Sequence, residues 1–538
     1  MDGSYIKEER YGQDRRKLLV SRSKKIDVFI LFSFIAFFFF YLSHGLDTKD
    51  SGEFLVCAKR LLPAHSPGSV LYIIIGRLFV FMGAVGVNLL SLIFSVSSLF
   101  ILLKLSKDNT LFKILIIILF SGSSIVYYST SAEVYTAVLF FISLIVFFAE
   151  KRKYEALSFS SGLLALLSPI YFLLTLPFIL IHLFKYKNKK NIIFIFILPI
   201  IIYLFITIRL PYINNVFSSD SFIKTIDFIS GKDFAVKKNV LSFDFGWITN
   251  NVVSLFLKSI KMSSFWFIVF VMFLCQIDLK KNVDVLITLL LYFVFFVLLR
   301  LDVKNVFHFF IPIIPLILRL FKDVRLEKSV LHKNIFISVA LFFIVFSIFN
   351  IDVKHTRLPL MYAKDVVDIV KETSLVIVSI DNRINYFKYL NEYTDYIKKD
   401  IIFINLADLS KDYYLRSLNK ELEIPEMIDT NPMVNLVNII ALNKNKKNIY
   451  FDADPSLYGV DISVYDHGLL FSTNVVSSLP LEIYNNIKEI TAFNITLNDP
   501  EFKNLIISYR IALENLKNKI KDDEIKKRID NWLSIYSY

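Results

Sequence analysis

Long apolar stretches alternate with short charged ones through residues 26–350, and this pattern predicts helices that cross a membrane. A helix needs about 20 apolar residues to cross the hydrocarbon, where no water satisfies a free backbone group. We expect about eleven such spans. They are 26–43, 86–105, 112–128, 131–149, two short helices within 156–184, 191–208, 251–274, 283–299, 305–321 and 335–350.

Polar stretches divide these spans into loops of different length. The first outer loop, 44–85, contains two stretches, 52–62 and 69–82, that are too short or too interrupted to span. Their apolar residues fall on one helical face, so we expect amphipathic helices that lie along the outer surface of the membrane. A second polar outer loop is expected over 209–247.

The distribution of charge sets the orientation of the chain. The net charge is +13, and 55% of the residues are hydrophobic, which excludes an ordinary soluble domain. Lys and Arg gather in short loops beside the apolar runs, as positive-inside signals do, so we do not expect nucleic-acid binding. The basic tail 1–25 is predicted to be cytoplasmic. The protein as a whole is expected in the plasma or inner membrane. An odd number of spans then places the C-terminus outside.

The composition changes after Asn350 to mixed charge with short apolar runs. This pattern predicts that residues 351–538 form an extracytoplasmic α/β domain with a sheet of parallel character. Buried strands are expected at 374–380, 401–406 and 448–451, helices at 384–397 and 431–442, and amphipathic helices within 498–535.

Metal-binding patterns are weak. Cys57 and Cys275 stand in different segments without a CxxC neighbour. Asp452-Ala453-Asp454 resembles a DxD metal motif, but no nucleotide-sugar fold surrounds it. We therefore expect no metal ligands, and neither a divalent metal nor another cofactor is implied.

The first outer loop carries the strongest candidate chemistry. Asp50 and Glu53 are three residues apart, which places both carboxylates on one face of a helix that begins there. A carboxylate at the membrane boundary has its pKa raised by burial and lowered by nearby cations, which suits a general base. The alternative is helix capping, because acids also favour a helix N-terminus.

Cations and imidazoles on the same side could bind phosphate. Arg77 interrupts an apolar run, where a cation costs about 3 kcal/mol at the bilayer centre, so it must meet an anion or snorkel. His65 belongs to the same loop. Lys304 and His308 form a second phosphate-binding candidate, or an ordinary charged turn. Glu133 begins a span at the same membrane level as Asp50, either as a cap or as a functional acid.

Short motifs link these residues to a known family. They are Asp50-Ser51-Gly52-Glu53-Phe54, His65-Ser66-Pro67-Gly68, Gly76-Arg77-Leu78-Phe79, Val87-Asn88-Leu89 and Glu133-Val134-Tyr135. The motifs resemble the signature of the DUF2723 membrane proteins, which are related to the protein O-mannosyltransferases of the GT-C superfamily. Residues 361–406, with Asp381-Asn382 after a predicted strand, resemble the post-membrane segment of that family. Ser66 departs from the family's HPPG motif, and Ser379-Ile380 from the glycine that often precedes Asp381.

The resemblance implies a GT-C fold and transfer of a sugar, mannose in the related family, from a polyprenyl-phosphate carrier to an acceptor hydroxyl with inversion. The acceptor would be a protein Ser/Thr or a glycan. Asp50 would be the general base, and Glu53 or Glu133 would orient the acceptor. His65 and Arg77 would offset the charge of the lipid phosphate, and Tyr135 would contact substrate.

Two other classes of function fit the same composition. A transporter or flippase of a lipid-linked substrate also places charges in membrane helices, although it predicts charges at mid-span and inverted repeats. A noncatalytic membrane assembly factor would use its outer domain to bind a partner, and would keep its function when Asp50 is changed to Asn.

Overall fold

The computed structural model groups the chain into two compact units. The helical unit comprises Met1–Leu42, Leu61–Arg209 and Asn215–Val353, and the α/β unit comprises Ser43–Arg60, Leu210–Asn214 and Lys354–Tyr538. The structure describes residues 24–47, 50–65, 68–107, 109–184, 200–202, 204–206, 208–209, 223, 225–226, 280–298, 311–323, 338, 341–342, 345, 358–380, 383–397, 400–410, 412–419, 421–429, 431–460, 462–466, 469–473, 500–519 and 523–535.

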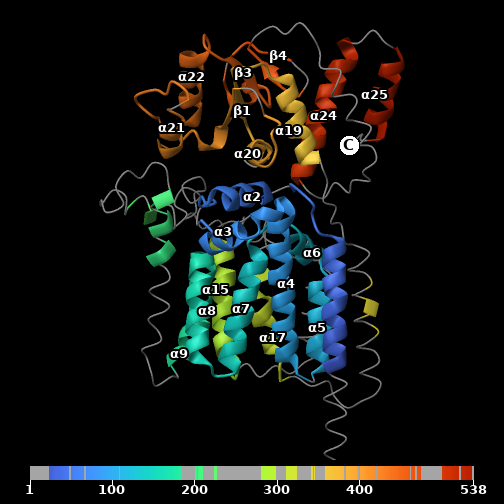
Figure 1. Cartoon of the computed structure of the whole chain (residues 1–538), viewed down its shortest axis with the longest axis vertical. Helices are drawn as coiled ribbons and strands as arrows, with labels where there is room; N and C mark the ends of the chain where they lie inside the picture. Colours follow the sequence, from blue (N-terminus) through green and yellow to red (C-terminus); the bar gives the residue numbers. More distant parts are fainter. Residues whose placement is uncertain are drawn as a thin grey trace, which may run out of the picture. The chain divides into compact units, whose positions relative to one another are not determined.

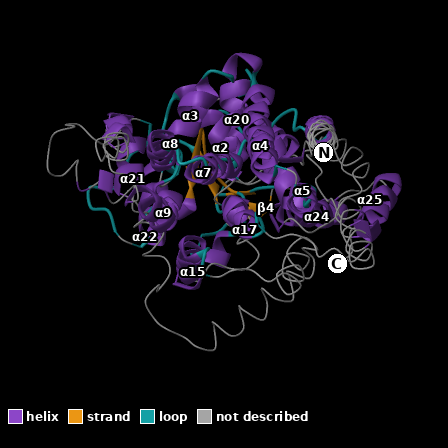
Figure 2. Cartoon of the chain, turned by 90° about the horizontal axis from the view of Figure 1, so that it is seen from below, coloured by secondary structure: helices purple, strands orange, loops and turns teal. Residues whose placement is uncertain are grey.

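The helical unit is a bundle of antiparallel neighbours (Figures 1 and 2). Along the chain, α4 packs on α7, α7 on α8, α8 on α9, and α9 on α15. Residues 24–40 are also helical. The elements are α3 (Val70–Arg77), η1 (Val80–Met82), α4 (Ala84–Ser106), α5 (Thr110–Phe120), α6 (Ser123–Thr130), α7 (Tyr135–Glu150), α8 (Tyr154–Leu167), α9 (Pro169–Phe184), α15 (Val283–Leu298), η3 (Ile311–Ile313) and α17 (Ile314–Leu320).

Local sequence explains where these helices break. Pro169 is the first residue of α9, a position that needs no backbone N–H donor, so the predicted hairpin 156–184 divides there into α8 and α9. The single span predicted over 112–128 is instead two helices, α5 and α6, that are bent by 68°. Ser121 and Gly122 lie between them, and Gly122 has extended backbone angles.

Among the described residues, α4 is the helix that is long and apolar enough to cross a membrane, and the bent pair α5 and α6 adds a second if it counts as one span. The helices α7, α8, α9, α15 and α17 are apolar but shorter. Most of the predicted spans 191–208, 251–274 and 335–350, and most of the outer loop 209–247, lie outside the described residues. The count of about eleven spans therefore stays a prediction.

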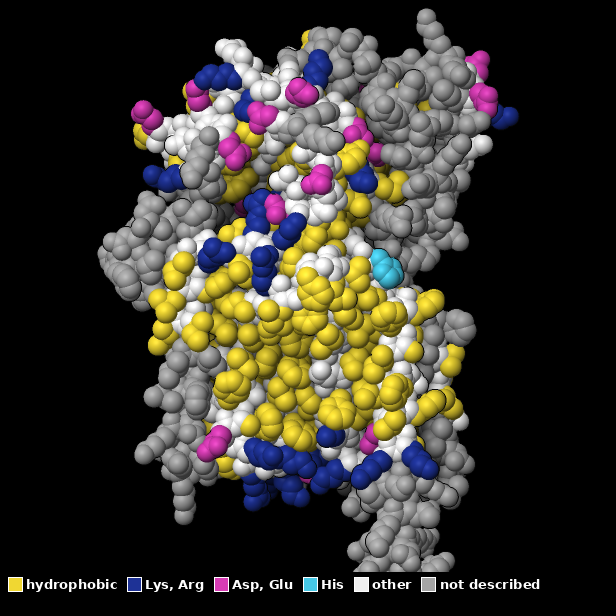
Figure 3. All heavy atoms as spheres, viewed as in Figure 1, with side chains coloured by type: hydrophobic (Ala, Val, Ile, Leu, Met, Phe, Trp, Pro, Cys, Tyr) yellow, Lys and Arg dark blue, Asp and Glu magenta, His cyan; other side chains and the backbone are white. Residues whose placement is uncertain are grey.

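Hydrophobic and charged side chains separate on the surface of the helical unit. Figure 3 shows a broad band of hydrophobic side chains over the helices, with Lys and Arg gathered at one end of the band. The ends of α4, α7 and α17 meet at one end of the bundle, since Asn109 donates to the Phe321 and Lys322 carbonyls and Lys322 pairs with Glu150. Basic residues at one end of an apolar helical surface fit the positive-inside pattern.

The α/β unit is built on one sheet. The strands that the structure describes are ordered β2-β1-β3-β5-β4, with β1 parallel to β2 and β3, and β5 antiparallel to β3 and β4. The strands are β1 (Ser374–Val378), β2 (Ile401–Asn405), β3 (Asn448–Phe451), β4 (Tyr465–Asp466) and β5 (Phe471–Ser472). The helices are α2 (Ser51–Arg60), α19 (Leu358–Ile369), α20 (Arg383–Tyr393), α21 (Asp412–Leu418), α22 (Pro432–Asn443), α24 (Pro500–Lys519) and α25 (Asp523–Ile535), with η4 (Leu406–Asp408) and η5 (Pro455–Tyr458).

The predicted strands at 374–380, 401–406 and 448–451 are present, and they pair in parallel as their continuous apolar runs suggested. All five residues of β1 are buried, as expected for a central strand covered on both faces. Leu375, Ile404 and Ile449 belong to the buried core that the sheet shares with α22. The structure adds one feature that the domain boundaries did not predict. Residues 43–60 of the first outer loop belong to this unit.

Candidate functional site

The two acids of the first loop lie at the start of α2 in the α/β unit. The Asp50 carbonyl accepts the first backbone hydrogen bond of the helix, from Phe54 N at 3.0 Å. Glu53 stands in the first turn, and Lys59 and Arg60 in the last. Both acids are partly buried. This order of charges favours the helix, because acids stabilise its N-terminus and cations its C-terminus.

One face of α2 is deeply buried. Phe54, Leu55 and Ala58 are at most 1% exposed. Burial raises the pKa of the Cys57 thiol, the charge of Glu53 raises it further, and Lys388 and Arg60 oppose the shift. Glu53 therefore acts electrostatically on a buried neighbour one turn away. Cys57 is a buried free cysteine that packs within this face.

The other first-loop candidates lie in the helical unit. His65 is in a turn that Gly68 closes, with Gly68 N donating to the His65 carbonyl at 2.8 Å and Ala64 N donating to the Gly68 carbonyl at 3.2 Å. Gly68 has a φ of 97°, which explains the glycine of this motif. Arg77 is exposed and ends α3, so its charge lies at a helix terminus rather than inside an apolar helix.

Glu133 is buried, with 1% of its surface exposed, between α6 and α7. The Ser91 hydroxyl connects it to the rest of the unit, donating to the Glu133 carbonyl at 3.1 Å and accepting from Glu133 N at 3.2 Å. The Tyr72 hydroxyl lies 2.8 Å from the Ser91 hydroxyl. Val134 is the N-cap of α7. Glu133 is thus held by α3 and α4, and it is not the cap that one sequence interpretation allowed.

Tyr135 is the first residue of α7 and packs on Tyr128 of α6, with ring centroids 5.0 Å apart at 72°. This edge contact fixes the Glu133-Val134-Tyr135 motif against the preceding helix. The predicted phosphate-binding residues Lys304 and His308 lie outside the described residues.

The acids of the DxD-like sequence have structural partners. Asp452 accepts from Ser379 N at 2.8 Å and pairs with Arg383 Nη1 at 3.3 Å. Asp454 caps η5 by accepting from Ser456 N at 2.9 Å. Asp452 therefore joins the end of β3 to the end of β1 and to α20, and Asp454 caps the turn that follows.

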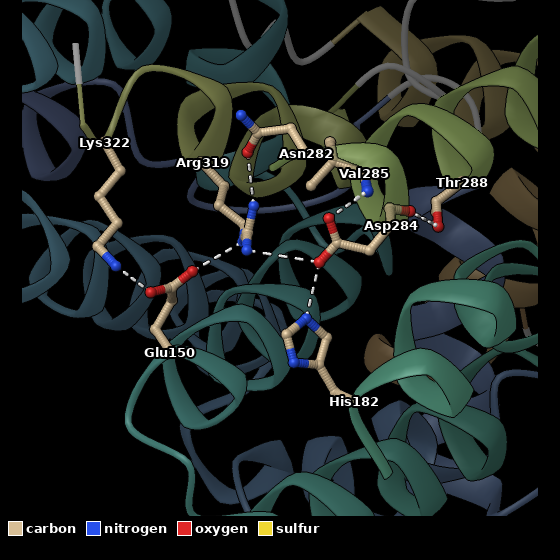
Figure 4. Close-up of polar contacts among 8 residues, drawn as sticks. All are labelled: Glu150, His182, Asn282, Asp284, Val285, Thr288, Arg319 and Lys322. Carbon is tan, nitrogen blue, oxygen red and sulfur yellow. Dashed lines mark hydrogen bonds and ion pairs between the residues drawn. The ribbon is translucent and has the colours of Figure 1, made fainter. Parts of the chain in front are cut away.

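A charged cluster that sequence reasoning passed over lies in the helical unit, where the ends of α7, α9, α15 and α17 meet (Figure 4). Arg319 Nε is 2.8 Å from Glu150 Oε1, and Arg319 Nη2 is 3.4 Å from Asp284 Oδ2. His182 Nε2 is 2.8 Å from the same Asp284 oxygen, and Lys322 pairs with Glu150. In the sequence, Glu150 and Asp284 each stand at the end of an apolar run beside a basic loop, and this pattern could have indicated the cluster. We call these residues the ionic cluster.

A comparison with family models identifies part of the chain. Residues 50–114 match the model described as the N-terminal domain of the protein O-mannosyl-transferase TMEM260. The predicted relation to the protein O-mannosyltransferases is confirmed. The matched segment runs from Asp50 through α2, α3 and α4 into α5. It includes Glu53, His65 and Arg77, whereas Glu133 and Tyr135 follow it.

The chain was also compared with solved structures and with curated proteins. The crystal structure of ArnT from Cupriavidus metallidurans in the apo state aligns with 86% of this chain and 98% of its own, at 10% identity and a TM-score of 0.47. No curated protein matches the chain.

Proposed function

We propose that this protein is an integral membrane glycosyltransferase that moves a sugar from a polyprenyl-phosphate carrier to an acceptor hydroxyl on the outer face. The observation that carries the proposal is the O-mannosyl-transferase match over residues 50–114, which contains Asp50 and Glu53. The matched model is described as an O-mannosyl-transferase domain, so mannose is the proposed sugar. The acceptor is a protein Ser/Thr or a glycan.

In the proposed reaction Asp50 removes the proton of the acceptor hydroxyl as its oxygen bonds to C1 of the sugar. The bond between C1 and the phosphate oxygen breaks, and its electron pair leaves with the polyprenyl phosphate. Attack from the opposite face inverts C1. Glu53 or Glu133 orients the acceptor, and Tyr135 contacts substrate.

Charge develops on the departing phosphate in this reaction, so cations that meet it lower the barrier. His65 and Arg77 have this role in the proposal, and Lys304 and His308 are further candidates. Arg77 fits the role because it is exposed at the end of α3 and can reach a lipid phosphate. The basic end of the helical unit supports the proposed cytoplasmic N-terminus (Figure 3). In the proposal the α/β unit lies outside the membrane.

The test is release of polyprenyl phosphate from polyprenyl-phosphate-mannose by the purified protein in lipid, with wild type and Asp50→Asn compared. We expect turnover in the wild type and its loss in the folded, inserted variant. Wild-type turnover in Asp50→Asn would refute the role of Asp50. Movement of labelled donor between leaflets without sugar transfer would instead indicate a flippase.

The proposed reaction uses a carboxylate base, and no motif of the first loop demands a divalent metal. Turnover measured with and without EDTA tests whether the reaction needs one. A loss that added Mg²⁺ or Mn²⁺ restores would show a metal requirement without refuting sugar transfer.

A further inference from the structure

The helix that begins with the catalytic acids is packed on a helix of the C-terminal sequence. Within the α/β unit, α2 lies against α20. The Tyr393 hydroxyl donates to the Leu55 carbonyl of α2 at 2.7 Å. Lys59 donates to the Glu392 carbonyl, and Arg60 pairs with the Glu392 carboxylate. The contacts join residues more than 300 positions apart in the chain.

The N-terminal end of α2 is equally close to α20. A Cβ at Gly52 would lie 3.2 Å from both Cβ and the carbonyl oxygen of Asn385, and 2.8 Å from Cδ1 of Leu46. Gly52 stands between Asp50 and Glu53, so α20 meets α2 where the two acids are. The glycine of the DxGEF-like motif is therefore required by close packing.

At its own N-terminus, α20 is fixed to the sheet. Arg383 is 3% exposed and pairs with Asp452, which follows β3. Arg383 Nη1 also donates to Tyr362 Oη at 3.0 Å, and its Nη2 to Ser508 Oγ at 2.9 Å. A buried guanidinium with partners on α19, α24 and the end of β3 holds α20 in one orientation.

We propose that α20 is the positioning element for the acids of the first loop, with Tyr393 and Asn385 as positioning residues. The chain of contacts runs from the sheet through Arg383 to α20, and through Tyr393 and Asn385 to α2. This inference rests on the proposed function and gives the C-terminal unit a part in catalysis. Catalytic groups must keep their geometry within a fraction of an ångström. Contacts with α20 at both ends of α2 provide that constraint.

Tyr393→Phe tests the inference because it removes one hydroxyl and keeps the ring that stacks on Tyr389 at 4.9 Å. We expect kcat to fall about tenfold with KM within about twofold, since the base is misplaced and not removed. Amide hydrogen exchange over 51–60 should become faster.

Tyr396→Phe is the matched control. Its hydroxyl bonds to the Asp368 carboxylate of α19. We expect wild-type kcat, KM and exchange over α2. Gly52→Ala is the second variant, because its added methyl group pushes α2 away from Asn385. It should reproduce the kcat loss and the faster exchange even if Tyr393→Phe fails to fold.

The outcomes separate the two proposals. An inactive wild type with every donor refutes the proposed function, and exchange over α2 then decides alone whether α20 holds this helix. An active wild type with unchanged kcat and exchange in Tyr393→Phe and Gly52→Ala overturns the positioning role. Equal losses in Tyr396→Phe would also overturn it, because the effect would then be general to this region.

Discussion

His182 Nε2 lies 2.8 Å from Asp284 Oδ2, and this contact joins α9 to α15 inside the helical unit. The same carboxylate meets Arg319, which also pairs with Glu150 at the end of α7. Buried charges are stable when each has partners of opposite sign, and removal of one partner leaves the others uncompensated. The ionic cluster is therefore expected to hold the bundle together and not to take part in sugar transfer.

Arg319→Met should destabilise the protein by about 3 kcal/mol or more, because Glu150 and Asp284 lose their shared cation. The measurement is thermal unfolding in detergent. Lys151→Met is the control, since Lys151 is exposed at the end of α7 and should change the midpoint little. A wild-type midpoint in Arg319→Met would show that the cluster does not stabilise the bundle.

Asp50→Asn should lower kcat about 100-fold or more, within the range for loss of a general base. Glu53→Gln should lower it less, because an orienting amide still bonds to a hydroxyl. Initial rates of polyprenyl phosphate release measure both. The assignment would be reversed if Glu53→Gln were the more damaging change.

Ser91→Ala removes the hydroxyl between Tyr72 and the Glu133 backbone. We expect a loss of about 1 to 2 kcal/mol in stability and a fall in kcat, because Glu133 becomes less fixed. Ser98→Ala is a matched control on the same helix. Its side chain is equally buried and bonds only within α4, to the Phe94 carbonyl, among the contacts that the structure describes. Equal effects of the two changes would argue against a role for the Ser91 bridge.

The α/β unit should lose stability above about pH 10. Burial raises the pKa of Tyr458 from 10.0 to about 12, and the charge of Asp452 acts in the same direction. The folded state holds the proton that the unfolded state releases, so this contribution is present below pH 10.0 and is lost between pH 10.0 and about 12. Calorimetry from pH 9 to 12 should show a smaller alkaline loss in Tyr458→Phe than in the control Tyr465→Phe, where the residue is exposed. Identical pH curves for the two variants would contradict this account.

Much of the local structure could be predicted from the sequence. The apolar runs at 374–380, 401–406 and 448–451 gave β1, β2 and β3, because a strand covered on both faces needs apolar residues in succession. Pro169 marked the break between α8 and α9. The stretch 112–128 is helical as predicted but bent between α5 and α6, since a Ser-Gly pair permits either a continuous helix or a bend, and packing chooses between them.

The candidate site was predicted in part. The motif at Asp50 and Glu53 is a local pattern, and the family model that begins at Asp50 matches it. Asp452 and Asp454 have the spacing of a DxD motif that was not expected to bind metal, and in the structure they bond to Ser379, Arg383 and Ser456. A carboxylate has the same appearance in the sequence whether it binds a metal, a substrate or a neighbouring arginine.

The sequence by itself determined the apolar helical pattern, the strands β1, β2 and β3, the similarity of residues 50–114 to a protein O-mannosyl-transferase domain and the residue types available for chemistry, because periodicity, proline and short motifs act over a few neighbouring residues. Only the tertiary structure decided that α2 belongs with the C-terminal sheet, that Glu150, Asp284 and Arg319 meet, and that Gly52 packs on Asn385. These contacts join distant segments, and they depend on which surfaces fit together once the helices and the sheet have formed.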